Sequence, residues 1–260
     1  ALHAALKGAP DMARALARLS LDRFAPRDLG AIRDGLARAE AMDAALADAA
    51  GVPPIPALIG TARAALRPAD SPRAELQRAL ADPLPARLDD GGLIAAGYDG
   101  ELDALRRLRD GAREAIAALQ MDLAQAWGVA SLKIRHHQQF GFLAELPSAA
   151  GEKLLREGMK EGPHAPVHRQ TMANAMRFTC TALAELDRRV AEAGEQAGRR
   201  DKVIIQHLRR LCLGAATGIA AAAAAMAEID VHAAAAELAA DGRWCRPEMT
   251  DRADFAVVAA

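Results

Sequence analysis

Two long series of apolar residues at helical spacing flank one stretch, residues 130–178, that lacks this spacing. In the first series, from Leu102 to Trp127, successive apolar residues stand three or four positions apart. This spacing predicts a single helix over 101–127, about 40 Å long at about 1.5 Å per residue. The second series begins at Leu183 and continues in alanine toward Leu238. Two such helices, running antiparallel, would hold the stretch between them at the far end of a stalk.

The residues before the first series contain shorter helical patterns separated by prolines. Pro10-Asp11 and Pro26-Arg27-Asp28 each place a proline near a first helical turn and an acidic residue close to the positive end of the helix dipole. Residues 1–88 are therefore expected to form a helical bundle. The connection 89–100 is rich in glycine but contains no GxGxxG motif, and no Lys-Ser or Lys-Thr pair follows its glycines. A turn therefore explains this segment better than a phosphate-binding loop.

Composition supports a helical fold class. Apolar residues make up 52% of the chain but aromatic residues only 3%, so the core must consist mainly of leucine and alanine, as in closely packed helices. The expected fold is mainly α: a helical core with two long antiparallel helices that carry a small β-rich insertion. The longest uncharged apolar run, Leu211–Ala227, has 17 residues, which is short for a membrane span, so it is expected to be a buried helix with no membrane contact.

The cysteines indicate the cellular compartment of the protein, and the first residue indicates whether the sequence is complete. Cys180, Cys212 and Cys245 are far apart and odd in number, which favours a reducing compartment, the cytoplasm, over a disulfide framework. The sequence starts at Ala1 without a methionine. It is therefore expected to be a piece of a longer protein.

Residues 130–178 combine strand-like alternation with positive charge. Leu132 and Ile134 alternate, and after a turn-like His-His-Gln-Gln run the apolar residues continue at Phe140 and Phe142, which favours a twisted strand pair. Seven lysines and arginines stand against four glutamates, a net charge of +3, whereas the whole chain carries −1 and the remainder therefore −4.

The sequence contains no convincing set of catalytic or metal-binding residues. No nucleophile with a base, isolated carboxylate pair or nucleotide loop stands out. His164 and His168 have i to i+4 spacing, but Pro163 and Pro166 oppose a helix there, and no cysteine pair or HExxH supports a metal site. His136 and His137 bring the number of histidines in this stretch to four, but they add no ligand pattern. Neither catalytic residues nor metal ligands are therefore predicted.

A contact with a polyanion is the remaining candidate. Residues 130–144 and 163–178 contain no acidic residue, and amide and hydroxyl side chains lie between their cations; such groups make most contacts to nucleic-acid phosphates. These two segments are the predicted contact side. Residues 145–162 hold all four glutamates and are interpreted as a connector. An ordinary solvated hairpin stays open as the alternative.

A series of short motifs follows a recognisable order along nearly the whole chain. The motifs are Pro10-Asp11-Met12-Ala13-Arg14 with Arg18-Leu19, Pro26-Arg27-Asp28-Leu29, Gly97-Tyr98-Asp99 with Glu101-Leu102-Asp103, Ser131-Leu132-Lys133-Ile134, Gly141-Phe142, Arg169-Gln170-Thr171, Asn174-Ala175, Arg177-Phe178, Asp230 and Arg246-Pro247. No single tripeptide among them is specific, but their order and spacing are. Read together, they resemble the middle of the MutS family of DNA mismatch-repair proteins.

The resemblance implies a helical core, two lever helices, and a clamp that grips double-stranded DNA by its backbone without reading sequence. The implied division is core and first lever helix over 1–129, clamp over 130–178, second lever helix and return to the core over 179–245, and the start of a linker over 246–260. The two tip loops that match family DNA contacts are His137-Gln138 and Met172-Ala173-Asn174. Ala173 replaces a lysine that many relatives carry, and Arg135 and His136 also depart from the common pattern. The implied DNA-binding residues are Lys133, Arg135, His137, Gln138, Arg169, Thr171, Met172, Ala173, Asn174 and Arg177.

Missing motifs limit what the segment itself is expected to do. No GxxxxGK[ST] and no Phe-x-Glu occur, so neither the family's ATPase nor its mismatch-probing wedge is expected here. The segment would need no cofactor and would not be an enzyme, whereas the complete protein would use ATP and Mg. The resemblance further implies a homodimer, a MutL-type partner and a nucleoid-associated bacterial setting. The alternative is a different kind of function, in which the chain is a structural helical scaffold or a protein-interaction arm. Its basic tip would then dock an acidic partner.

Overall fold

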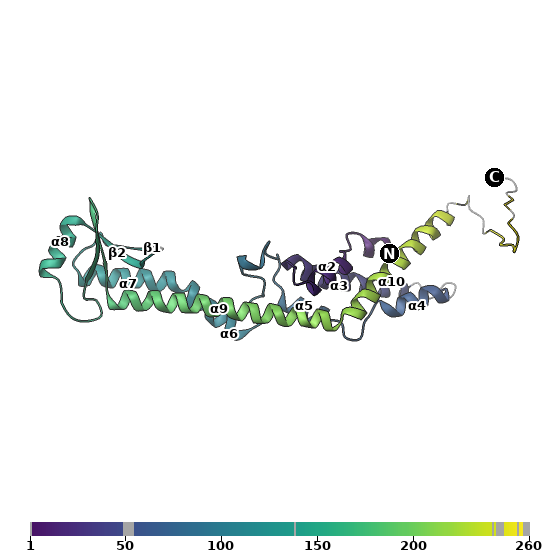
Figure 1. Ribbon diagram of the computed structural model, residues 1–260, viewed down its shortest axis with the longest axis horizontal. Coiled ribbons are helices and arrows are strands. Elements are labelled where there is room, and N and C mark those ends of the chain that lie inside the picture. The colour runs from purple at the N-terminus through teal and green to yellow at the C-terminus, as the bar shows by residue number, and fades with distance from the viewer. Residues whose placement is uncertain are drawn as a thin grey trace. The chain divides into compact units, whose positions relative to one another are not determined.

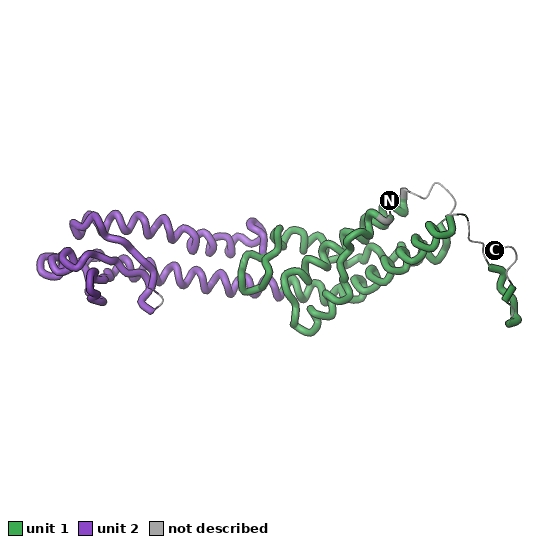
Figure 2. Tube along the Cα trace, turned by 90° about the horizontal axis from the view of Figure 1, so that it is seen from above, with its two compact units in different colours: residues 1–93, 207–260 green, residues 94–206 purple. Residues whose placement is uncertain are grey.

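The computed structural model describes residues 2–48, 55–137, 139–240, 242, 247–253 and 255–256. The chain divides into two compact units, which Figure 2 shows in different colours. Unit 1 contains Ala1–Leu93 and His207–Ala260, and unit 2 contains Ile94–Gln206. The predicted Gln138, Cys245 and Arg246 lie outside the described residues.

Unit 1 is helical, and its helices begin where the prolines and acidic residues predicted them. Asp11 precedes α2, and its Oδ1 accepts the backbone N–H of Arg14 at 2.9 Å. Pro26 is the first residue of α3, and Asp28 in its first turn accepts the Ala25 N–H at 2.7 Å. The elements are α1 (Leu2–Leu6), α2 (Met12–Ser20), α3 (Pro26–Asp48), α4 (Ala57–Ala65), α5 (Arg73–Ala79), the 3-10 helix η1 (Leu88–Asp90) and α10 (Ala216–Ala240).

The alanine-rich run is a core helix over its first half. Ile219, Met226 and Ile229 of α10 are buried, and α10 contacts α2, α3 and α4 within unit 1. Its length and composition would also suit a membrane span. Burial of one face against other helices explains the same apolar composition without a membrane.

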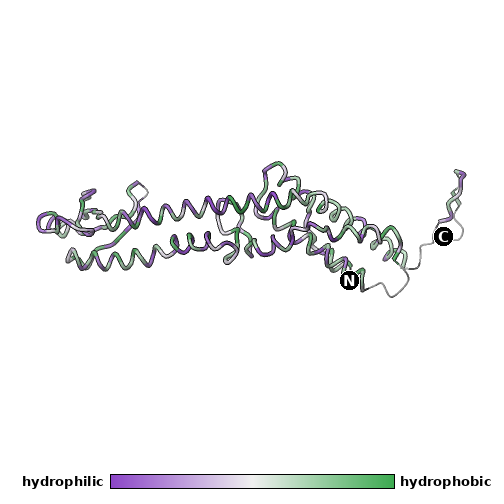
Figure 3. The backbone as a smooth tube through the Cα atoms, turned by 90° about the horizontal axis from the view of Figure 1, so that it is seen from below, coloured by the Kyte–Doolittle hydropathy of each residue, from purple (hydrophilic) through white to green (hydrophobic). Residues whose placement is uncertain are grey.

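Unit 2 holds the first predicted long helix, the insertion and most of the first part of the second predicted helix. Its elements are α6 (Gly100–Asp110), α7 (Ala112–Ala126), β1 (Lys133–His137), β2 (Gly141–Pro147), α8 (Ser148–Glu157), β3 (Val167–Thr171) and β4 (Ala175–Thr179), with most of α9 (Thr181–Gly214). The second series does not form one unbroken helix toward Leu238, because α9 ends at Gly214 and α10 begins at Ala216 in unit 1. Figure 1 shows α7 beside α9, and Figure 3 shows hydrophilic and hydrophobic residues following one another along α9. The chain is mainly α with a small β part, which confirms the expected fold class.

The first long helix is broken, so the prediction of one helix over 101–127 was wrong. Gly111 separates α6 from α7 and ends the regular helix, although its N–H still donates to the Arg107 carbonyl at 2.8 Å. A Cβ at this position would lie 2.8 Å from that carbonyl oxygen, so the local bend needs glycine. The apolar spacing continues across the break, so the sequence pattern does not reveal it.

The insertion is an antiparallel sheet with the strand order β1-β2-β4-β3. On one face, Ala144, Met176 and Phe178 are buried in a core that also contains Leu123 of α7 and Trp127, which directly follows that helix. Helix α8 contacts β2 and β4. The predicted division into 1–129, 130–178, 179–245 and 246–260 follows the family resemblance and stays a prediction, whereas the strands themselves extend from Lys133 to Thr179.

Candidate nucleic-acid interface

The second face of the sheet carries a row of four polar side chains, one from each strand. Lys133 of β1 pairs in register with Glu145 of β2, Glu145 pairs with Arg177 of β4, and Arg177 pairs with Gln170 of β3. Residues that pair in an antiparallel sheet point to the same face. We call Lys133, Glu145, Arg177 and Gln170 the polar row.

Glu145 is the centre of this row. Arg177 donates from Nε to Glu145 Oε1 at 2.8 Å and from Nη1 to Gln170 Oε1 at 2.8 Å, which ties β4 to both of its neighbours. Arg135 Nε lies 3.3 Å from Glu145 Oε2. His137 Nε2 lies 3.3 Å from Glu145 Oε1, close but without hydrogen-bond alignment. We call Glu145, Arg135, His137 and Arg177 the Glu145 cluster.

This arrangement overturns the interpretation of 145–162 as a connector. Residues up to Pro147 belong to β2, and Ser148–Glu157 form helix α8, whose Leu154 is buried in the sheet core. The prediction missed that the alternation of Phe142, Ala144 and Leu146 continues the strand and places Glu145 on the opposite face. One acidic residue of the supposed connector therefore lies among the predicted DNA-contacting cations.

Two predicted cations keep their charge available to solvent. Lys133 and Arg169 are exposed, and neither makes an ion pair with any residue in the described part of the chain. Lys133 stands at one end of the polar row, and Arg169 lies on β3 at the irregular step in its pairing with β4. The structure therefore divides the predicted cations into two that are free and two, Arg135 and Arg177, that contact Glu145.

The two predicted tip loops lie at opposite ends of the sheet. The turn after β1 closes with the Phe140 N–H donating to the His137 carbonyl at 3.2 Å and leads into Gly141, which has φ 69°. The turn after β3 closes with the Met172 N–H donating to the Ala175 carbonyl at 2.8 Å. Because Ala175 pairs with Pro147 at the far end of β2 from Gly141, the strand order separates the loops. Ala173 and Asn174 in the second loop are exposed, and Met172 is half-buried.

The remaining predicted residues of β3 and the histidines make local contacts. His168 Nε2 lies 2.9 Å from Thr171 Oγ1, and its ring meets Phe178 edge-on. His164 supplies its backbone carbonyl to Trp127 Nε1 at 2.7 Å. Across the part of the chain that the structure describes, no three His, Cys, Asp or Glu side chains are placed to hold a metal ion.

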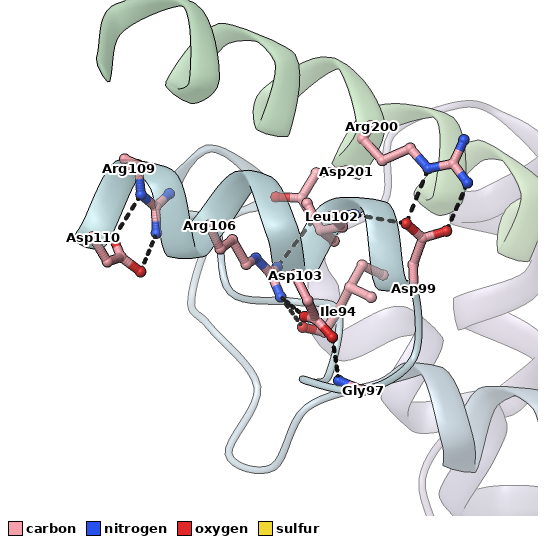
Figure 4. Close-up of polar contacts among 10 residues, drawn as sticks. All are labelled: Ile94, Gly97, Asp99, Leu102, Asp103, Arg106, Arg109, Asp110, Arg200 and Asp201. Carbon is pink, nitrogen blue, oxygen red and sulfur yellow. Dashed lines mark hydrogen bonds and ion pairs between the residues drawn. The ribbon is translucent and has the colours of Figure 1, made fainter. Parts of the chain in front are cut away.

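A second polar network joins the start of α6 to α9, as Figure 4 shows. Arg200 donates to both carboxylate oxygens of Asp99 at 3.1 and 2.7 Å, and Asp99 also caps α6 by accepting the Leu102 N–H at 2.8 Å. These hydrogen bonds, the one from Arg200 first, lower the pKa of Asp99. Arg106 donates to Asp201 at 3.2 Å and to the Ile94 carbonyl at 3.0 Å. Burial nevertheless raises the pKa of Asp201. This network orients the two helices that lead to the sheet.

Sequence comparison places these features among known proteins. Residues 97–196 match the family described as MutS family domain IV. The chain is 50% identical over 96% of its length to the "DNA mismatch repair protein MutS" of Granulibacter bethesdensis. It is 44% identical over 98% of its length to the protein of that name from Rhodopseudomonas palustris strain BisA53, and 40% over 98% to that from Dinoroseobacter shibae. The chain spans 26%, 28% and 28% of these relatives.

Proposed function

We propose that this chain, which belongs to the MutS family, contacts the backbone of double-stranded DNA through its four-stranded sheet. The observation that carries the proposal is the charge of the sheet surface. Four strand residues, Lys133, Arg135, Arg169 and Arg177, oppose the single strand glutamate Glu145, and 4 minus 1 gives +3. Such a patch attracts phosphate groups without regard to base sequence.

The dimensions of the sheet suit a contact with several phosphates. From Gly141 to Pro147, β2 advances about 20 Å at about 3.4 Å per residue, and the two predicted contact loops lie at its two ends. That length corresponds to about six base pairs at about 3.4 Å each. A surface with contacts at both ends would hold the duplex at separated points and would set its orientation more firmly than one tip could.

The helices of unit 2 provide a mechanical link for the complete protein. Helices α6 and α7 lie antiparallel to α9, because Asp99 pairs with Arg200 whereas Leu123 shares a core with Leu183. We propose that this pair carries movement between the sheet and an ATPase domain elsewhere in the complete protein, which would bind ATP and Mg. Cytoplasmic location, a homodimer and a MutL-type partner belong to the same proposal. The segment alone is expected to show no ATP turnover.

The test is a salt series of duplex binding followed by fluorescence anisotropy, with two duplexes of unrelated sequence. The expected result is weak binding of equal strength to both duplexes that falls steeply as salt rises. Replacing Lys133, Arg169 and Asn174 together by alanine should weaken binding and flatten the salt dependence by about two units of slope, because two cations are lost. The matched control replaces Arg27 and Lys202, two exposed cations far from the sheet in sequence, by alanine.

Unchanged binding in the triple variant, or equal affinity at low and high salt, contradicts the proposal. A polyglutamate of equal charge separates it from the alternative of a protein-interaction arm. Preference for the acidic polypeptide over DNA would favour the arm.

A further inference from the structure

We propose that the Glu145 carboxylate occupies an anion-binding position of the sheet and withholds Arg177 and Arg135 from phosphate groups. The inference rests on the proposed function and assigns Glu145 the role of a residue that limits DNA affinity. A carboxylate and a phosphate accept the same pair of guanidinium donors. Glu145 therefore stands where a phosphate oxygen would otherwise be bound.

The contacts around Glu145 have the composition of an anion site. One carboxylate faces Arg177 Nε at 2.8 Å, Arg135 Nε at 3.3 Å and His137 Nε2 at 3.3 Å. Two permanent positive charges meet one negative charge, so the cluster carries +1 even with a neutral histidine. Gln170 supports the cluster from the other side because its Oε1 accepts from Arg177 Nη1.

The exposure of these side chains indicates how an outside anion could reach them. The Arg135 side chain is 61% exposed, whereas those of Arg177 and Glu145 are 19% and 18% exposed. A phosphate can thus approach Arg135 from solvent, but Glu145 already holds the inner arginine. In contrast, neither Lys133 nor Arg169 forms an ion pair with any described residue, although Lys133 lies opposite Glu145 in strand register, so both charges stay open to phosphate.

The variant that separates this role from a structural one is Glu145→Gln. Glutamine keeps the length of the side chain and an oxygen that can accept from Arg177 Nε, so the link between β2 and β4 is retained while the negative charge is lost. Glu152→Gln is the matched control, because Glu152 is an exposed residue of α8 and its loss changes the net charge equally. Glu145→Ser serves as a second variant if circular dichroism shows that the first is unfolded.

Two readouts on the full chain test the inference. The first is duplex affinity, which in E145Q should be about threefold to tenfold tighter than in E152Q, with a salt slope steeper by about one unit. The second is the NMR signal of the Arg177 Nε–H during titration with inorganic phosphate at constant ionic strength. That signal should shift in E145Q and stay unchanged in the parent chain and in E152Q.

The phosphate titration does not depend on DNA binding, so the two proposals can fail separately. A phosphate shift in E145Q with no detectable duplex binding by any variant supports the role of Glu145 and overturns the proposed function. No phosphate shift in E145Q overturns the inference whatever the duplex affinities are. Where duplex does bind, an E145Q affinity and slope equal to those of E152Q also overturn it.

Discussion

Arg177 Nε donates a hydrogen bond to Glu145 Oε1 at 2.8 Å, and this contact joins neighbouring strands β4 and β2 on the polar face of the sheet. Arg177 also reaches Gln170 on β3, so one guanidinium spans three strands. A planar fork with several donors can do this, whereas the single ammonium of lysine cannot do so with the same geometry. The residue is therefore expected to stabilise the sheet besides contributing charge.

Replacing Arg177 by glutamine should lower the free energy of unfolding of unit 2 by about 1–2 kcal/mol, because Glu145 loses its best donor in a half-buried position. R177K should recover only part of this loss. Urea unfolding followed by Trp127 fluorescence in a W244F background measures it. Arg188, whose pair with Glu192 is exposed, provides the control R188Q, for which a change below about 0.5 kcal/mol is expected. Equal effects of R177Q and R188Q would contradict the expectation.

Gly151 allows α8 to lie against the sheet. A Cβ there would stand 2.7 Å from Sδ and 2.8 Å from Cβ of the buried Met176. G151A should therefore destabilise unit 2 by about 1–3 kcal/mol. In an M176A background the same change should cost less, because Sδ and Cγ are removed, but part of the cost should remain because the Cβ at 2.8 Å is kept.

Gly194 is the matched control for this glycine. It lies inside α9 with nothing within 4 Å of a Cβ, so G194A should stabilise the helix by up to about 1 kcal/mol. Both changes are measured by urea unfolding with Trp127 fluorescence. Destabilisation by G194A as large as that by G151A would show that space around α8 is not the cause.

Asp99 and Asp201 should affect the pH dependence of stability in opposite directions. Asp99, held by Arg200, has a pKa below its ordinary 3.8. Its contribution to the free energy of unfolding is therefore present above pH 3.8 and is lost as the pH falls through the lower pKa of the folded state. Burial places the pKa of Asp201 above 3.8, so its contribution is present below 3.8 and is lost as pH rises through its folded pKa.

The free energy of unfolding should therefore decrease less on acidification in D99N than in the parent chain. In D201N it should decrease more. Urea unfolding at a series of pH values from about 2 to 5 spans both windows. D110N offers a comparison at the exposed end of α6. The hydrogen bond from Arg109 also lowers the pKa of Asp110, so D110N should change the pH dependence in the same direction as D99N, and by less because the pair is open to solvent. The same direction of change in D99N and D201N would contradict the assignment.

The buried thiols of Cys180 and Cys212 should react slowly with thiol reagents. Burial raises the pKa of Cys212 from its ordinary 9.0 to about 12, so at pH 8 its thiolate fraction should be about a thousandfold lower than that of a free cysteine. Burial raises the pKa of Cys180 as well. In a C245S background, reaction with an aromatic disulfide reagent should be slow in native buffer and fast in urea. Rapid native labelling of Cys212 would show that α9 opens readily in unit 1.

Much of the fold could be predicted from short-range patterns. Helical spacing, proline positions and acidic residues located α2, α3, the combined span of α6 and α7, and α9, because each of these signals acts within a few residues of chain. The break at Gly111 was missed because apolar residues continue at spacings of three and four positions across it. The tip loops could be proposed from motifs, but their separation depends on the strand order β1-β2-β4-β3.

The sequence by itself determined the helical class, the position of the β insertion and the family. It also identified most of the cations, since these follow from local periodicity and from motif order. Only the tertiary structure decided which cations are free. Strand pairing sets both Lys133 and Arg177 opposite Glu145, but of the described lysines and arginines only Arg177 and the neighbouring Arg135 form ion pairs with it, whereas Lys133 and Arg169 are left open. The physical reason is that a charge is neutralised by its neighbours in space, and those neighbours depend on strand pairing and on which donors reach the carboxylate rather than on position along the chain.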